Sequence, residues 1–80
     1  MIDVLTGKPL RVIPLEDGGG AFTVAVSQLE EIQRLFDSRG IFYWADDQAL
    51  SWNGGPEEVD VHLGRNVDPA AVQAVLDSVG

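Results

Sequence analysis

Two helix-length segments, each with its own start and stop signals, lie among short apolar strands in a chain of 80 residues. The helical segments cover residues 27–40 and 68–80, and the strands precede and separate them. Strands and helices mixed in this way within one short chain are typical of the α+β class. A chain of this length forms one domain with a single thin core. We therefore expect one small α+β domain over 1–80, with residues 1–8 as a poorly defined lead-in.

The first helix is expected over 27–40. Ser27 and Glu30 have the spacing of a capping box, in which the hydroxyl accepts from a free backbone N–H and the carboxylate reaches back to the cap. Gly40 suits the left-handed conformation that ends many helices, and Arg39 in the last turn complements the helix dipole. Helical spacing places four apolar side chains on one face, namely Leu29, Ile32, Leu35 and Phe36.

The second helix is expected over 68–80. Asp68 supplies an N-cap carboxylate, and Pro69 occupies the first helical position, where its missing N–H has no helical partner to lose. The apolar stripe of this helix consists of Val72, Val75, Leu76 and Val79. Both helices therefore have one face to bury against a sheet.

The two segments before the first helix are expected to pair as an antiparallel hairpin. Residues 10–15 form an apolar strand, but Pro14 lacks an N–H and restricts this strand to an edge of the sheet. Residues 16–20 end in glycines, which supply the positive φ that a tight turn needs. Residues 21–26 alternate cleanly, and one face carries Phe22, Val24 and Val26.

Three segments after the first helix complete the expected sheet. Residues 41–45 are aromatic and β-branched, residues 58–63 alternate, and residues 49–52 are a candidate for a short strand. A right-handed crossover through the first helix makes 21–26 and 41–45 parallel to each other. Strand 58–63 then fits between them, antiparallel to both.

The resulting order of elements, β-β-α-β-(β)-β-α, predicts a circularly permuted ferredoxin-like arrangement. Without the N-terminal strand, the elements match the ferredoxin-like plan lacking its final strand. Strand 10–15 reaches the same slot from the other end of the chain. We therefore predict an α+β two-layer sandwich, with an antiparallel (mixed) sheet of four to five strands and two helices on one face. One alternative stays open: if 49–52 is a full strand, the direction of 58–63 reverses and the topology changes.

The charge balance excludes some classes of partner. Thirteen acids against five bases give a net charge of −8, whereas nucleic acids and anionic membranes are bound by clustered cations. We expect no nucleic-acid partner and no membrane partner. The chain has no cysteine, no apolar run of the roughly 20 residues that span a bilayer and no N-terminal secretory pattern. We expect a cytoplasmic protein.

Residues with catalytic chemistry are few. His62, the single histidine, shares a strand face with Asp60, and a carboxylate beside an imidazole can serve acid–base chemistry. No nucleophile motif accompanies them. The acids between positions 46 and 60 match no metal-binding loop, and the two glycine-rich stretches lead into strands, unlike phosphate loops. The sequence therefore predicts no catalytic set, no metal site and no cofactor.

The aromatic residues of 41–45 indicate which large side chains lie on the face of the sheet that the helices leave open. Two helices cover only one face, and alternation sends Phe42 and Trp44 to one side and Tyr43 to the other. We expect Trp44 in the core and Tyr43 on the open face, because a hydroxyl needs water or a partner. Trp52 either folds over as a lid for the small core or belongs to a contact surface.

Binding is the function that agrees best with these observations. We expect a protein- or ligand-binding or regulatory module that acts through the open sheet face, with binding residues Tyr43, Trp52, Asp60 and His62. The partner would be a protein or a small molecule, and the same face could join two copies as a homodimer. The alternative is a small enzyme or metal-dependent catalyst that uses His62 with Asp60 and nearby turn acids. It requires a concave pocket, for which two thin layers leave little room.

Overall fold

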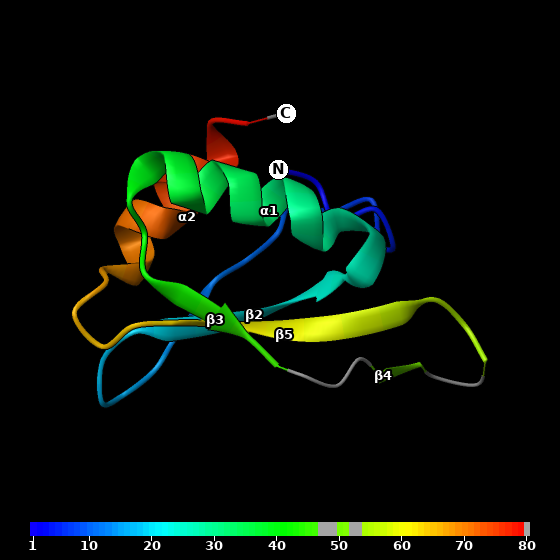
Figure 1. Ribbon diagram of the computed structural model, residues 1–80, viewed down its shortest axis with the longest axis horizontal. Helices are drawn as coiled ribbons and strands as arrows, with labels where there is room; N and C mark the ends of the chain where they lie inside the picture. Colours follow the sequence, from blue (N-terminus) through cyan, green and yellow to red (C-terminus); the bar gives the residue numbers. More distant parts are fainter. Residues whose placement is uncertain (47–49, 52–53, 80) are drawn as a thin grey trace.

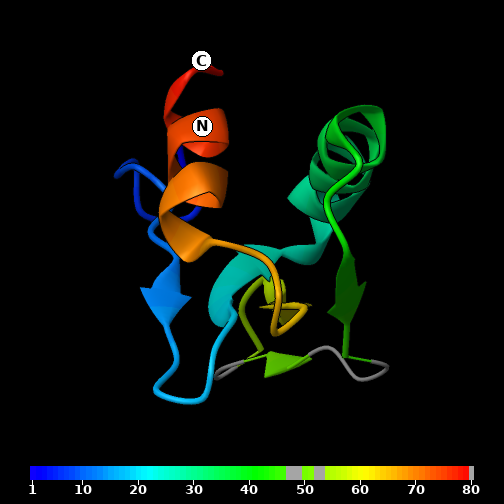
Figure 2. The same cartoon turned by 90° about the vertical axis from the view of Figure 1, so that its left-hand side faces the viewer.

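One sheet carries both helices on the same side in the computed structural model, which describes residues 1–46, 50–51 and 54–79 (Figures 1 and 2). The elements follow in the order β1 (Ile13–Pro14), β2 (Gly20–Ala25), α1 (Val26–Arg39), β3 (Tyr43–Ala45), β4 (Leu50–Ser51), β5 (Glu57–Leu63) and α2 (Pro69–Asp77). The α+β class and the placement of both helices on one face are as the sequence predicted.

The four strands of the main sheet follow the order β1-β2-β5-β3, and every neighbouring pair is antiparallel. The long strand β5 lies between β2 and β3, so the predicted position of 58–63 is confirmed. The strand with Pro14 lies at the end of the order, where the missing N–H interrupts no ladder.

The short strand β4 continues the edge that β3 begins. Ala45 pairs with Val61, and Leu50 pairs antiparallel with Glu58. If the ladder with β5 continued without interruption from Ala45, residue 48 would lie opposite Glu58. Leu50 lies there instead, so this edge has two extra residues between β3 and β4. Because β4 runs in the same direction as β3, β5 keeps its direction, and the alternative topology based on 49–52 is wrong. Residues 49 and 52 themselves lie outside the described part of the chain.

The core lies between the sheet and the two helices. Phe36 of α1 is fully buried and meets the ring of Phe22 edge-on, with 6.1 Å between ring centroids. Burying an apolar side chain of this size contributes about 1.5–3 kcal/mol. The larger buried apolar residues that join them from the helices and the two central strands are Ile32, Val72, Leu76, Val24, Val59, Val61 and Leu63. They come from the stripes and strand faces that the sequence pattern identified.

Two of the predicted helix ends are confirmed. Gly40 has a φ of 68°, and the N–H of Ile41 donates to the carbonyl of Phe36 at 3.0 Å, which satisfies the last turn of α1. At the start of α2, the Asp68 carboxylate accepts from the N–H of Ala70 at 2.9 Å.

The predicted cap at Ser27 is wrong. The helix α1 begins one residue earlier, at Val26, and its N-cap is Ala25, which forms no side-chain hydrogen bond. Ala25 is also the last residue of β2 and pairs with Glu58. The strand therefore fixes the point at which the chain turns, and Ser27 falls inside the first turn. Glu30 bonds forward to Arg34 at 2.6 Å instead of back to the cap.

Residues 1–10, part of which was expected to be an undefined lead-in, form a small hairpin. Ile2 and Pro9 make an antiparallel bridge, and the N–H of Leu10 donates to the carbonyl of Met1. The side chains of Met1 and Leu10 belong to the core, and the Met1 amino group donates to the carbonyl of Leu76. The sequence pattern missed this hairpin because its strands are too short to alternate visibly.

Gln28 on α1 holds the hairpin in place. Its side chain is buried, its Nε2 donates to the carbonyl of Ile2 at 2.7 Å, and its Oε1 accepts from the N–H of Val4 at 3.3 Å. The amide thereby bonds to the carbonyl of one residue and to the N–H two residues further on, as the backbone of a neighbouring strand would.

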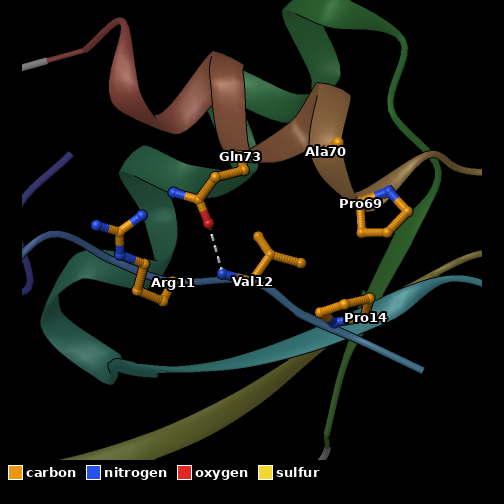
Figure 3. Close-up of a pocket in the computed structure, with 6 residues that line it drawn as sticks. All are labelled: Arg11, Val12, Pro14, Pro69, Ala70 and Gln73. Atoms are coloured by element: carbon orange, nitrogen blue, oxygen red, sulfur yellow. Dashed lines mark hydrogen bonds between the residues drawn. The ribbon is translucent and has the colours of Figure 1, made fainter.

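Gln73 on α2 makes the same pattern further along the chain. Its Nε2 donates to the carbonyl of Leu10 at 2.9 Å, and its Oε1 accepts from the N–H of Val12 at 2.8 Å (Figure 3). The strand expected over 10–15 pairs with β2 only at Ile13 and Pro14. Its first part is bonded to the side chain of a helix residue in place of a strand.

Two helix-start variants should separate the real cap from the sequence-predicted one. Asp68→Ala removes the acceptor of a cap hydrogen bond and should lower the free energy of unfolding by about 1 kcal/mol. Ser27→Ala removes a hydroxyl that makes no cap bond and should change it by less than about 0.5 kcal/mol. Urea denaturation of both variants measures the difference. A larger loss in Ser27→Ala than in Asp68→Ala would contradict the observed helix start.

The buried amide of Gln28 should matter more than its size suggests. Gln28→Met keeps the volume but leaves a carbonyl and an N–H of the hairpin without partners, so we expect a loss of about 1–3 kcal/mol in unfolding free energy. The matched control is Gln33→Met on the same helix, because Gln33 makes no side-chain hydrogen bond to a described residue. Equal midpoints for the two variants in urea would show that Gln28 does not anchor the hairpin.

Candidate functional site

The face of the sheet opposite the helices carries two cross-strand rows of side chains. Alternation along β2 and β5 sends Phe22 and Val61 to the helices, and it sends Thr23 and Asp60 to the open side. The sequence predicted this division correctly for β5 and for Phe22 and Val24 of β2, but Val26, expected on the same inward face, begins α1 and is exposed. The rows differ in chemistry, and their contacts define what the face can bind.

One row crosses all four main strands and is here called the aromatic row. Ile13, Ala21, His62 and Trp44 lie opposite one another in register. The indole of Trp44 stacks on the imidazole of His62, with 5.4 Å between ring centroids and 18° between the ring planes. Trp44 remains 49% exposed and Ile13 64% exposed. Apolar and aromatic surface of this kind, left open to solvent, is typical of a contact site.

Phe42 extends the aromatic row along β5. Its ring is 67% exposed, lies 6.2 Å from the ring of Trp44 and covers Gly64. A Cβ atom at position 64 would come within 2.6 Å of the Phe42 ring. The absence of a side chain at Gly64 therefore lets the Phe42 ring approach the backbone closely at the end of β5.

The neighbouring row is polar and is here called the acidic row. Thr23 lies opposite Asp60, and its hydroxyl donates to the Asp60 carboxylate at 2.6 Å. Asp46 follows β3, and its Oδ1 lies 2.9 Å from Nε2 of His62. Asp46 thus links the acidic row to the aromatic row. None of the five cations of the chain belongs to either row; these are Lys8, Arg11, Arg34, Arg39 and Arg65.

The structure brings together only part of the predicted site. Asp60 and His62 both lie on the open face, but Asp60 is bonded to Thr23 and His62 to Asp46. The pairing of His62 with Asp60 that the enzymatic alternative used is therefore replaced by two separate contacts. Trp52 lies outside the described residues.

The predicted orientations of Tyr43 and Trp44 are reversed. Tyr43 packs edge-on against Phe36, with 5.4 Å between ring centroids, and Trp44 lies on the open face. The reason is the end of α1: the N–H of Ile41 bonds back to Phe36, and Ile41 packs against the core. Alternation then sends Tyr43 inward and Trp44 outward. The sequence signal for this orientation is the apolar Ile41 directly after Gly40, because Ile41 and Tyr43 share one face of the strand.

The hydroxyl of Tyr43 has a partner at the edge of the core. Burial raises the pKa of Tyr43 above its usual value, and the negative charge and hydrogen bond of Asp37 raise it further. The neutral phenol is therefore the form that the folded state favours. The partly buried ring thus packs against the core while its hydroxyl meets the carboxylate of a helix residue.

A hollow of about 290 Å³ lies outside the sheet, between the N-terminal segment and α2 (Figure 3). It is lined by Arg11, Val12, Pro14, Pro69, Ala70 and Gln73. The amide of Gln73 is bonded to the backbone and to Asp77, which leaves Arg11 as the one charged group of the lining. No cluster of metal-ligating side chains occurs among the described residues. Neither described helix is long and apolar enough to cross a membrane.

Comparison with protein-family models, with curated proteins and with solved structures finds no match to this chain.

The titration of Tyr43 should show that its ring faces the core. Tyr43 is the only tyrosine, so absorbance of the phenolate reports on it alone. We expect a midpoint above pH 10 in the folded protein, and Asp37→Asn should lower the midpoint while leaving it raised, because burial is the larger cause. Since the folded pKa exceeds the unfolded one, stability should be complete below about pH 10 and fall as the pH rises further. A midpoint equal to that of the unfolded chain would place Tyr43 in solvent.

Proposed function

We propose that this chain is a protein-binding module whose open sheet face docks a basic segment of a partner protein. The observation that carries the proposal is the half-exposed indole of Trp44, stacked on His62 and next to the carboxylate of Asp46. An exposed ring attracts a lysine or arginine side chain through its π face. The nearby carboxylate supplies the opposite charge.

The charge distribution supports a basic partner. The net charge of −8 steers cationic surfaces toward the protein. The acidic row, formed by Thr23, Asp60 and Asp46, places part of this charge beside the aromatic row. In this arrangement the aromatic row provides the apolar contact, and the acidic row beside it selects the partner by charge. Protein interfaces commonly divide these two roles between an apolar centre and a polar rim.

A circularly permuted ferredoxin-like plan is part of the proposal. The strand order β1-β2-β5-β3 with antiparallel neighbours supports it, because β1 occupies the place of the final strand of that plan. An open sheet opposite two helices then serves as a platform for ligands. The functional conclusion rests on the site and not on this fold relation.

A synthetic peptide with alternating valine and arginine, Val-Arg-Val-Arg-Val-Arg-Val with blocked ends, tests the proposal. We expect binding at about 150 mM salt, where long-range charge effects are largely screened. Backbone amide shifts should map to β3 and β5 and not to the helices. Trp44→Ala should weaken binding by about two- to thirtyfold, which corresponds to the about 0.5–2 kcal/mol of a cation–π contact. Titration calorimetry or amide shifts measure the change.

Matched charge variants separate the site from general attraction. Asp46→Asn and Glu31→Gln each remove one negative charge, but Asp46 touches His62 whereas Glu31 lies exposed on α1. We expect Asp46→Asn to weaken the peptide complex several-fold and Glu31→Gln to leave it nearly unchanged. Equal losses in both variants, or shifts confined to the helices, would overturn the proposed function.

A further inference from the structure

The two edges of the sheet differ in whether a further strand can join them. On the β1 edge, Ile13 bonds inward to β2 in register with Ala21, so the backbone of Val12 and Pro14 faces outward. The N–H of Val12 is taken by Gln73, and Pro14 has none (Figure 3). This edge therefore offers no free donor at the outward positions of its strand.

The β3 edge is open among the described residues. Phe42 accepts from the N–H of Gly64, and Asp46 donates to the carbonyl of Asp60, so positions 42, 44 and 46 bond toward β5. In an antiparallel ladder the residues between them point their backbone groups away. Tyr43 and Ala45 therefore each present one N–H and one carbonyl to the outside. The strand β4 pairs with β5 and not with β3.

This open edge borders the proposed binding face. Trp44 is the central residue of β3 and the last member of the aromatic row, and Asp46 follows it directly. A strand added beside β3 would place every second side chain on the open face, next to the indole and the carboxylate. The remaining side chains would lie on the helix side, next to Tyr43 and Ala45.

Charge decides which chain can occupy the edge. A second copy would bring another net charge of −8 to the same place and would set two Asp46 carboxylates close to the shared edge. Like charges opposed across a pair of strands are destabilising. A segment with a lysine or arginine at every second position instead meets acids and an exposed ring.

We propose that the partner binds by strand addition: an extended segment with basic side chains at alternate positions pairs its backbone with Tyr43 and Ala45 at the β3 edge. This inference rests on the proposed function and adds to it the backbone geometry of the complex. Main-chain hydrogen bonds give such complexes affinity, and the alternate side chains give them selectivity.

N-methylation of the peptide tests the pairing directly. One peptide carries N-methyl groups on its valines and a second carries them on its arginines, with the same number of methyl groups within the paired region. In a strand bound to one edge, only alternate N–H groups point at the protein. We expect one set to weaken binding by about tenfold or more and the other to leave it within about threefold. Loss with the valine set indicates an antiparallel strand, and loss with the arginine set a parallel one.

Hydrogen exchange supplies a readout that a side-chain contact alone would not change. The unmodified peptide should slow exchange of the Tyr43 and Ala45 amides by about tenfold or more, because these amides face outward in the free protein. The amide of Trp44 already bonds to β5 and should change little. The control is a peptide of the same composition with its arginines in one block, which should protect these amides much less.

The outcomes distinguish the two proposals. If the peptide binds with the expected loss in Trp44→Ala but both methylated sets bind equally, strand addition is overturned and the proposed function stands. If the peptide does not bind, both are overturned. If the Tyr43 and Ala45 amides become protected with rising protein concentration and no peptide, the edge is occupied by a second copy, and the basic-segment proposal is overturned.

Discussion

The register of β2 against β5 is the constraint on which the rest of the molecule depends. Phe22 lies opposite Val61, and both side chains face the helices. Because side chains alternate, the same register puts Thr23 opposite Asp60 on the open face. A slip of one residue would bring a carboxylate beneath the helices and expose the core, at a cost that no contact in so small a domain could offset. The hydrophobic pattern thus determines the open face as strictly as it determines the core.

The two helices cover only one face of the single sheet. The apolar side chains of the other face are therefore shielded from water only by their neighbours on that face. Trp44 lies on His62, and Phe42 lies on the backbone at Gly64. Both rings nevertheless keep about half or more of their surface exposed. Acids border the same face, and the charge repulsion between copies would limit self-association through the exposed rings. This balance is the physical basis of the proposed preference for a partner of opposite charge over a second copy.

The sequence predicted those parts of the fold that depend on short-range patterns. Alternation in β5 and the stop at Gly40 gave the correct faces and boundaries, and from these the strand order followed. It failed where tertiary context decides. Ser27 has the right spacing for a cap, but the end of β2 sets the helix start. Tyr43 has a polar group, but Asp37 on the preceding helix satisfies it. The contact of His62 with Asp46 joins residues 16 apart in sequence and has no local signature.

The two sheet edges show how long-range contacts give a short sequence its functional asymmetry. The β1 edge is closed by two residues: Pro14 of the strand has no N–H, and Gln73, on a helix near the other end of the chain, bonds the N–H of Val12. The β3 edge has no comparable closure among the described residues. An unclosed edge in a natural protein invites pairing with other chains, and charge at its border is a common protection against pairing with itself. Here Asp46 occupies that border. In the proposed complex, the carboxylate that would repel a second copy would also attract the basic strand, so one group would both limit aggregation and select the partner.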